Sequence, residues 1–162
     1  MNLIFKKVLI LSFALIILNC GSDTDSGETS QQNLQMIDTT LKKAITGRWY
    51  TAEQQQFGLT VFAENCAICH GNKAQETVDW KTRTESGHYP PPPLNGTAHA
   101  WHHALPVLQT VIREGGKPYG GVMPAWEGIL SDDEITAVIA AFQSYWSDEV
   151  YERWLEIDQN SM

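Results

Sequence analysis

Cys66, Cys69 and His70 form a Cys-x-x-Cys-His pattern, and these are the residues whose types and spacing point most directly to chemistry. Cysteines three residues apart on one helical turn can reach two vinyl groups on one edge of a porphyrin, and the adjacent histidine can then coordinate its iron. This is the attachment pattern of c-type haem. A structural zinc site needs four ligands, but the chain has no second cysteine pair. A redox dithiol of the thioredoxin kind needs a βαβ setting, which the sequence does not predict. We therefore predict one covalently bound haem c.

Met123 is the candidate for the sixth iron ligand, because methionine opposite histidine raises the reduction potential of an electron carrier. The other methionines lie in the leader, in the polar linker and at the chain end: Met1, Met36 and Met162. Met123 lies in YGGVMPAW, where the glycines allow close approach of the backbone. An ordinary core methionine is the alternative, and His88 is a competing distal ligand.

Three helical segments are expected to position these residues. Thr51 and Gln54 fit a capping box that starts a helix running to about Asn65. A second helical segment follows Gly96, with Pro106 in the first turn of a new helix that Gly115 ends. The third begins at Ser131, and its apolar positions follow amphipathic spacing as far as Trp146: Ile135, Val138, Ile139, Phe142 and Trp146.

No segment alternates as a strand does, so the predicted fold class is all-α. We expect three to five helices wrapped around one haem, joined by long Gly/Pro-rich loops such as residues 73–96 and 115–128. Loops of this length in a small domain usually carry function.

The N-terminus has the layout of a signal peptide. Lys6 and Lys7 precede an apolar run over residues 8–18, which is short for a permanent membrane span. Cys20 then stands where a bacterial lipoprotein is cleaved and lipidated, although Asn19 replaces the small residue usual before that cysteine. An uncleaved anchor is the alternative. We predict an exported protein, anchored on the periplasmic or extracytoplasmic side of a membrane.

The remaining chain divides by composition. Residues 21–47 are a polar, flexible tether, residues 48–147 the haem domain, and residues 148–162 an acidic, helical C-terminal extension. The formal net charge of −8 excludes nucleic acid as an expected partner and favours redox partner proteins with a basic docking surface.

Three histidines, His99, His102 and His103, would share one face if they lay on an α-helix. Imidazoles in this arrangement can bind copper or zinc. The alternative is a solvent-exposed helix start beside Trp101. Lys81 and Arg83 are candidates to meet haem propionates, with a solvated loop as the alternative.

Residues 49–146 resemble a class I monohaem cytochrome c, of a bacterial, membrane-tethered, lipoprotein-like kind. The matching elements occur in the family's order: Gly58 and Phe62, then Cys66-Ala67-Ile68-Cys69-His70, Pro92-Pro93-Leu94-Asn95-Gly96, Gly121-Val122-Met123-Pro124 and the last amphipathic helix.

The resemblance implies specific contacts, and the sequence departs from the family pattern at Ala141 and in the loop between His70 and Pro92, which is longer than in compact members. The Pro92 carbonyl would accept a hydrogen bond from His70. The first and last helices would cross, with Gly58 admitting a side chain of the last helix. Ala141 stands where the family usually has an aromatic residue, so Phe142 or Trp146 would have to fill that contact.

The predicted function is one-electron transfer between respiratory or other redox partners by a His70/Met123-ligated haem, so the chain is predicted not to be an enzyme. Alternatives are a haem enzyme or gas sensor with a displaceable distal ligand, and a copper-handling protein that uses the histidine cluster.

Overall fold

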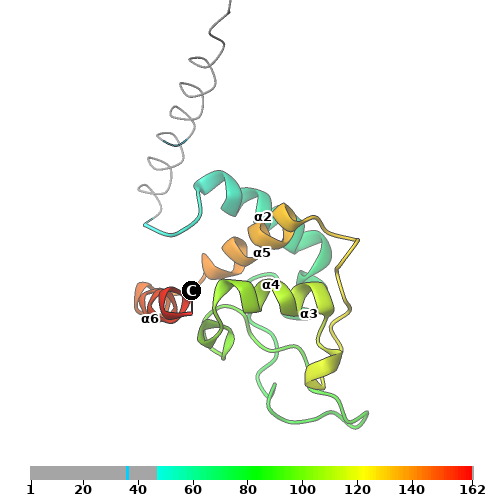
Figure 1. Cartoon of the computed structure of the whole chain (residues 1–162). Coiled ribbons are helices and arrows are strands. Elements are labelled where there is room, and N and C mark those ends of the chain that lie inside the picture. The colour runs from blue at the N-terminus through cyan, green and yellow to red at the C-terminus, as the bar shows by residue number, and fades with distance from the viewer. Residues whose placement is uncertain (1–35, 37–46, 162) are drawn as a thin grey trace, which may run out of the picture. The chain divides into compact units, whose positions relative to one another are not determined.

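The computed structural model describes Met36 and residues 47–161. Within 47–161 it contains five α-helices, two short 3₁₀ helices and only isolated β-bridges (Figure 1). The helices are α2 (Ala52–Asn65), α3 (Ala67–His70), α4 (Leu105–Glu114), α5 (Asp132–Gln143) and α6 (Asp148–Asn160), with η1 (Ala100–His102) and η2 (Lys117–Tyr119). The all-α fold class with three to five helices and long loops is therefore confirmed.

The predictions for the N-terminal segment lie largely outside the described residues. Neither the signal segment, residues 1–20, nor the lipidation candidate Cys20 is described, and the same holds for most of the tether. Among the residues that are described, no helix is long and apolar enough to span a membrane.

Helix α2 begins as predicted. The Thr51 hydroxyl accepts a hydrogen bond from the Gln54 backbone N–H, and the Gln54 side chain accepts one from the Thr51 backbone N–H. This reciprocal capping satisfies two donors that a helix start leaves unpaired. Val61 and Phe62 are buried on the inner face of the helix.

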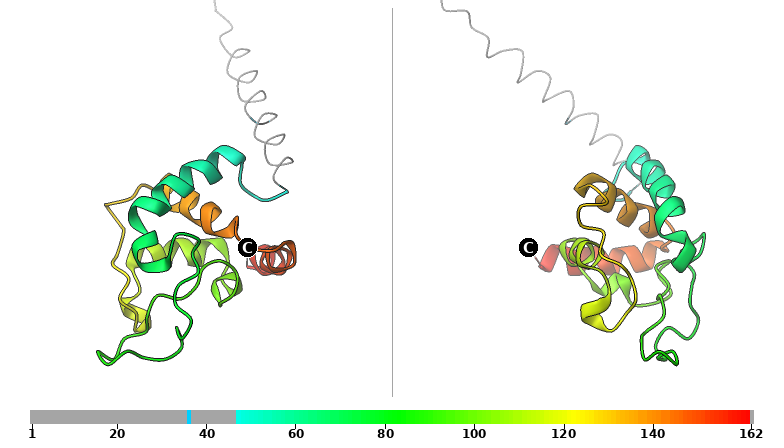
Figure 2. Two further views of the ribbon diagram at one scale, coloured as in Figure 1. Left: turned by 180° about the vertical axis from the view of Figure 1, so that it is seen from behind. Right: turned by 90° about the vertical axis from the view of Figure 1, so that its right-hand side faces the viewer.

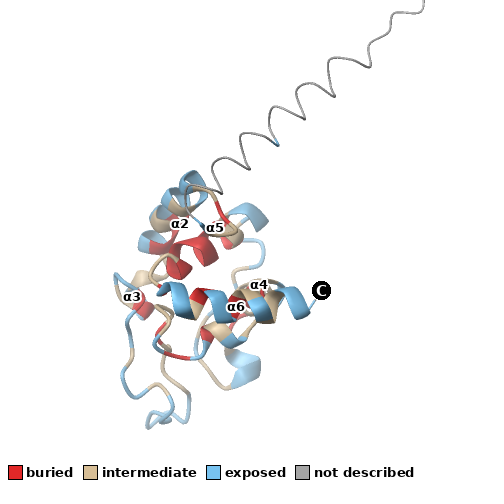
Figure 3. Ribbon diagram, turned by 90° about the vertical axis from the view of Figure 1, so that its left-hand side faces the viewer, coloured by how far each residue is buried: buried red, intermediate tan, exposed pale blue. Residues whose placement is uncertain are grey.

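Helix α5 is the centre of the core. Ser131 and Glu134 form its predicted capping box, and nearly every residue from Ile135 to Gln143 is buried. In Figure 3 the buried part of α5, drawn red, lies beside α2. One expectation is corrected: the helix ends at Gln143, so Trp146 is not on its amphipathic face but in the connection to α6. Trp146 is nevertheless buried.

The crossing of α2 and α5 depends on Gly58. A Cβ atom built on Gly58 would lie 1.8 Å from the Ala137 carbonyl oxygen and 3.2 Å from the Ala141 Cβ. The first and last helices of the expected core therefore do cross, but Gly58 makes room for the backbone of α5 as well as for a side chain. Ala141 is fully buried at this crossing, next to the position that a Gly58 side chain would take.

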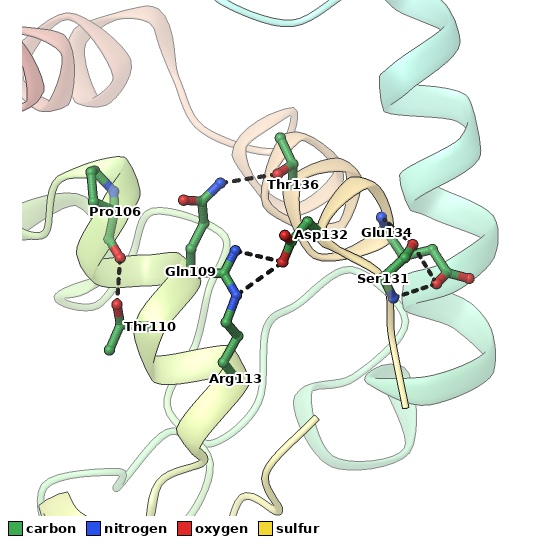
Figure 4. Close-up of polar contacts among 8 residues, drawn as sticks. All are labelled: Pro106, Gln109, Thr110, Arg113, Ser131, Asp132, Glu134 and Thr136. Carbon is green, nitrogen blue, oxygen red and sulfur yellow. Dashed lines mark hydrogen bonds and ion pairs between the residues drawn. The ribbon is translucent and has the colours of Figure 1, made fainter. Parts of the chain in front are cut away.

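Helix α4 also follows prediction, with Pro106 in its first turn and Gly115 at its end. It contacts α5 through a polar seam at the surface (Figure 4). Gln109 donates to the Thr136 hydroxyl at 3.0 Å, and Arg113 forms an ion pair with Asp132 at 2.7 Å. The polar seam adds to the apolar packing of α4, whose Leu108 is buried in the core, and the end of this helix carries the loop with Met123.

The predicted C-terminal extension forms α6, which packs on η1. Tyr151 and Trp154 are buried, and the Trp154 indole donates to the His103 carbonyl at 2.9 Å. Asp158 accepts from the first backbone N–H of α4, at Leu105. The helix is thus part of the core of residues 47–161, although the long loop between α3 and η1 extends away from the helices (Figure 2).

Candidate haem-binding site

The two candidate attachment cysteines lie at the junction of α2 and α3. Cys66 ends α2 and precedes α3, and Cys69 lies within α3, so one helical turn carries both. Both are free thiols, Cys66 half-buried and Cys69 exposed. Burial, with a smaller contribution from Cys69, raises the pKa of Cys66 to about 11. Its sulfur is therefore a neutral thiol near neutral pH.

His70 is the last residue of α3 and is buried, with 6% of its surface exposed. Its Nδ1 lies 3.0 Å from the Pro92 carbonyl oxygen, the pairing that the family resemblance implied. Because a carbonyl only accepts, Nδ1 carries the proton and Nε2 is left as the free lone pair. Burial lowers the pKa of His70, although the bond to Pro92 opposes the shift. The imidazole is thus neutral and in the tautomer that a metal ligand needs.

Residues 90–95, here called the proline segment, are fixed to the chain that follows His70. Thr77 donates its backbone N–H to the Pro91 carbonyl at 2.9 Å, and the N–H groups of Leu94 and Asn95 donate to the Ala74 carbonyl at 2.7 and 3.1 Å. From the other side, the Trp146 indole donates to the Leu94 carbonyl at 2.7 Å. The acceptor of the His70 bond is therefore part of a well-connected backbone.

Met123 is half-buried in the loop that follows η2. Its carbonyl accepts from the Gly116 N–H at 2.9 Å, just past the end of α4. A Cβ on Gly115 would lie 2.8 Å from the same carbonyl oxygen, and Gly115 has a φ of +82°, so two separate constraints favour glycine there. Further along, the Trp126 N–H donates to the last carbonyls of α4. The end of α4 therefore holds the Met123 loop.

Tyr89 connects the two candidate ligand segments. Its backbone N–H donates to the Gly120 carbonyl at 2.9 Å, and it forms an isolated bridge with Gly121. The proline segment begins at the next residue, and Met123 follows Gly121 by two positions. Arg83 lies over the Tyr89 ring, with its guanidinium carbon 4.2 Å from the ring centroid. Arg83 thus contacts Tyr89 while its side chain stays exposed, as a solvated loop residue would.

The three clustered histidines, His99, His102 and His103, do not lie on one face of an α-helix. The cluster surrounds the 3₁₀ helix η1, with His99 before it and His103 after it, instead of lying along an α-helix. His99 stacks on Trp80 at 4.6 Å between ring centroids, and His102 contacts Trp101 at 3.7 Å. Within the part of the chain that the structure describes, no group of three or more His, Cys, Asp or Glu residues could hold a metal ion.

Partial burial shifts the pKa values of two histidines in this cluster, His99 and His103. It lowers both pKa values, and the neighbouring imidazoles lower them further. The competing ligand candidate His88 is exposed, and its carbonyl accepts bonds from Thr84 in the outer loop. His99, His102 and His103 contact aromatic rings at the surface, and His88 lies exposed in the loop.

The residues present fit a covalently bound haem. Two free thiols share one helical turn next to a neutral histidine, and no hydrogen bond to its Nε2 occurs among the residues described. Large apolar side chains also stand exposed beside the candidate ligands: Ile68 is 91% exposed and Val122 is 50% exposed.

Sequence reasoning missed Ala74 and the indole bond of Trp146. Ala74 is fully buried with a φ of +56°, and its carbonyl receives two bonds from the proline segment. An alanine gives no sequence signal for this conformation, which usually belongs to glycine or asparagine. The tryptophan was recognised as apolar, but its partner, Leu94, is distant in sequence.

Comparison with known proteins places this site in a family. The model of the family described as cytochrome C oxidase, cbb3-type, subunit III matches residues 53–140, just over half of the chain. Cytochrome c6 of Euglena gracilis is 36% identical over 83 residues, which cover 50% of this chain and 80% of that protein. No solved structure gives a significant match. The chain therefore belongs to the cytochrome c family, whose members carry a covalently attached haem c.

Proposed function

We propose that this protein is a one-electron carrier in which Cys66 and Cys69 hold haem c through thioether bonds and His70 and Met123 are the axial iron ligands. The observation that carries the proposal is the 3.0 Å contact between His70 Nδ1 and the Pro92 carbonyl, directly after the two free thiols. It leaves Nε2 as the atom that would bind iron, and the bond raises the basicity of the ring.

When bound, the haem supplies an iron that alternates between the ferric and ferrous states. The chain keeps its ligands in place during this change. His70 is held by Pro92, and the Met123 backbone is held by Gly116 at the end of α4. Fixed ligands on both sides favour electron transfer over ligand exchange, because no coordination position opens for a substrate. Methionine as the second ligand raises the reduction potential.

We infer further that the protein works outside the cytoplasm, attached to a membrane through its N-terminus, with Cys20 as the lipidated residue. The apolar run over residues 8–18 and the cysteine that follows it support this. A tether raises the effective concentration of the protein near a membrane-bound partner. The net charge of −8 favours partners that present a basic surface.

The test is an anaerobic redox titration of the full haem-loaded chain, with carbon monoxide added to the ferrous form. An electron carrier gives a single one-electron transition and no carbon monoxide complex. Ready formation of that complex in the unmodified protein would contradict the proposal and favour a haem enzyme or gas sensor with a displaceable ligand. A Cys66→Ser, Cys69→Ser double variant, which should release haem on denaturation, tests the covalent attachment separately.

A further inference from the structure

We propose that Trp146 is a positioning residue for the iron ligand: its indole fixes the proline segment and thereby sets the strength of the hydrogen bond between Pro92 and His70. The inference rests on the proposed role of His70 as an iron ligand. It concerns a residue that lies beyond the stretch matched by the family model, in the connection between α5 and α6.

The indole acts on the segment at a point close to Pro92. Trp146 Nε1 donates to the Leu94 carbonyl oxygen at 2.7 Å, while the Leu94 N–H donates to Ala74 at the same distance. Both backbone polar groups of Leu94 are therefore bound. Only Pro93 separates Leu94 from Pro92, and this proline is buried with its φ angle fixed by the ring. A displacement of the Leu94 carbonyl would therefore be passed on to the Pro92 carbonyl.

Trp146 is itself firmly held. It is 3% exposed, and its carbonyl accepts a bond from the Arg48 guanidinium at 3.2 Å. A Cβ on Gly96 would lie 3.1 Å from Cδ1 of the indole, and Gly96 has a φ of +92°. A glycine at the end of the Pro-Pro-Leu-Asn-Gly stretch thus makes room for the ring. A buried indole N–H needs an acceptor, so the bond to Leu94 is costly to lose.

The expected consequence is electronic as well as structural. A strong bond from Nδ1–H to a carbonyl increases the electron density that imidazole gives to a metal. Greater donation favours the ferric state. If Trp146 no longer holds Leu94, the Pro92 carbonyl becomes more mobile and its hydrogen bond to His70 weakens on average. The ferrous state then becomes more stable relative to the ferric state.

Trp154 offers a matched control. It is also fully buried, and its Nε1 donates to a backbone carbonyl, that of His103, at 2.9 Å. That carbonyl belongs to the end of η1 and not to the proline segment. The two indoles are in edge contact, with ring centroids 6.1 Å apart, so the cleanest comparison removes one N–H and keeps both ring shapes. Loss of either indole bond should weaken the fold, but loss of the bond at Trp146 should change the His70 bond more.

The experiment compares Trp146→Phe and Trp154→Phe in the full haem-loaded chain. We measure the reduction equilibrium against a reference couple and, by NMR of the ferrous protein, the resonance of the His70 Nδ1 proton. Trp146→Phe should shift the equilibrium about threefold toward the ferrous form, about 28 mV for one electron, and move the proton resonance upfield. Trp154→Phe leaves the Trp146 indole bond in place and should shift both quantities much less.

A second variant keeps the test valid if Trp146→Phe does not fold. Replacing the indole by benzothiophene, through 3-benzothienylalanine at position 146, keeps the ring shape and removes only the N–H. If the substitutions at 146 and 154 gave equal reduction potentials and equal His70 proton shifts, the inference about Trp146 would be wrong. The proposed function would still stand as long as the haem-loaded protein keeps a low-spin spectrum. A wild-type protein whose iron is not bound by His70 would overturn both.

Discussion

The His70 side and the Met123 side of the site are held in different ways. His70 is buried, and a side-chain bond, the proline segment and a buried indole all support it. Met123 is half-buried, and its loop is held by backbone bonds to the end of α4. Helix α4 packs on α5 through buried Leu108 and through a polar seam that includes the Arg113–Asp132 ion pair. The histidine side is therefore built into the core, whereas the methionine side depends on a loop, and this side should yield first when the protein is perturbed.

The largest expected effect is the difference between two single variants, in which either His70 or Met123 is replaced by alanine. His70→Ala removes a buried ligand and leaves the Pro92 carbonyl without its partner, so little haem-loaded protein should accumulate. Met123→Ala should still fold and keep its haem. We expect the yield of covalently bound haem, measured by absorbance after denaturation, to differ at least about tenfold between the variants. Equal yields would mean that the two sides do not differ as described.

Gly58→Ala tests the crossing that supports the histidine side. Its Cβ would lie 1.8 Å from the Ala137 carbonyl oxygen, a backbone atom that cannot move aside without separating α2 from α5. We expect a loss of about 3 kcal/mol or more in the free energy of unfolding, measured by urea titration. Ala63→Ser, on the exposed face of the same helix, should change it by no more than about 0.5 kcal/mol. Similar values for both variants would show that the close approach is not needed.

Gly115→Ala tests the loop that carries Met123, with Gly128→Ala as its control. Both glycines have positive φ, +82° and +74°, but a Cβ on Gly115 would lie 2.8 Å from backbone atoms, whereas Gly128 has no atom within 4 Å. Backbone strain should be similar in the two variants. Gly115→Ala should lose about 1–3 kcal/mol more of unfolding free energy, and it alone should weaken the methionine–iron absorption band. If Gly115→Ala kept the methionine–iron absorption band, the contact between Gly115 and the Met123 loop would not be needed to place the methionine ligand.

The smallest expected effect concerns the capping box of α5. Hydrogen bonds from the Ser131 backbone and hydroxyl lower the pKa of Glu134 below its ordinary value of 4.5. The carboxylate therefore stabilises the fold above pH 4.5, and this stabilisation is lost as the pH falls through the lower folded pKa. Glu134→Gln should flatten the dependence of the urea midpoint on pH in that range. An unchanged slope would show that the cap does not titrate with folding.

Much of the fold could be predicted because its signals are local. The capping boxes at Thr51 and Ser131 and the Pro106/Gly115 pair mark helix ends through contacts within one or two turns, and the structure confirms them. The end of α5 was extended wrongly to Trp146, because its apolar spacing continues past the last helical residue. Spacing alone does not distinguish a helical residue from one that is buried by a following turn.

The remaining features depend on contacts between distant segments. The 1.8 Å approach at Gly58 involves the backbone of Ala137, and the positive φ of Ala74 serves the proline segment some twenty residues later. The cysteine–histidine pattern identifies a haem by local spacing. It gives no information on how the Met123 loop is held, because that depends on Gly116 and on the end of α4.

The most direct test of the central claim is the optical spectrum of the ferric and ferrous full chain, wild type and Met123→Leu, with Met36→Leu as the control. Met36 lies in the polar tether, outside the predicted haem domain, so its replacement should leave the spectrum unchanged. His70/Met123 ligation predicts a low-spin wild-type spectrum with the weak methionine–iron charge-transfer band, lost only in Met123→Leu. A high-spin wild-type spectrum, or a band that survives in Met123→Leu, would contradict the account.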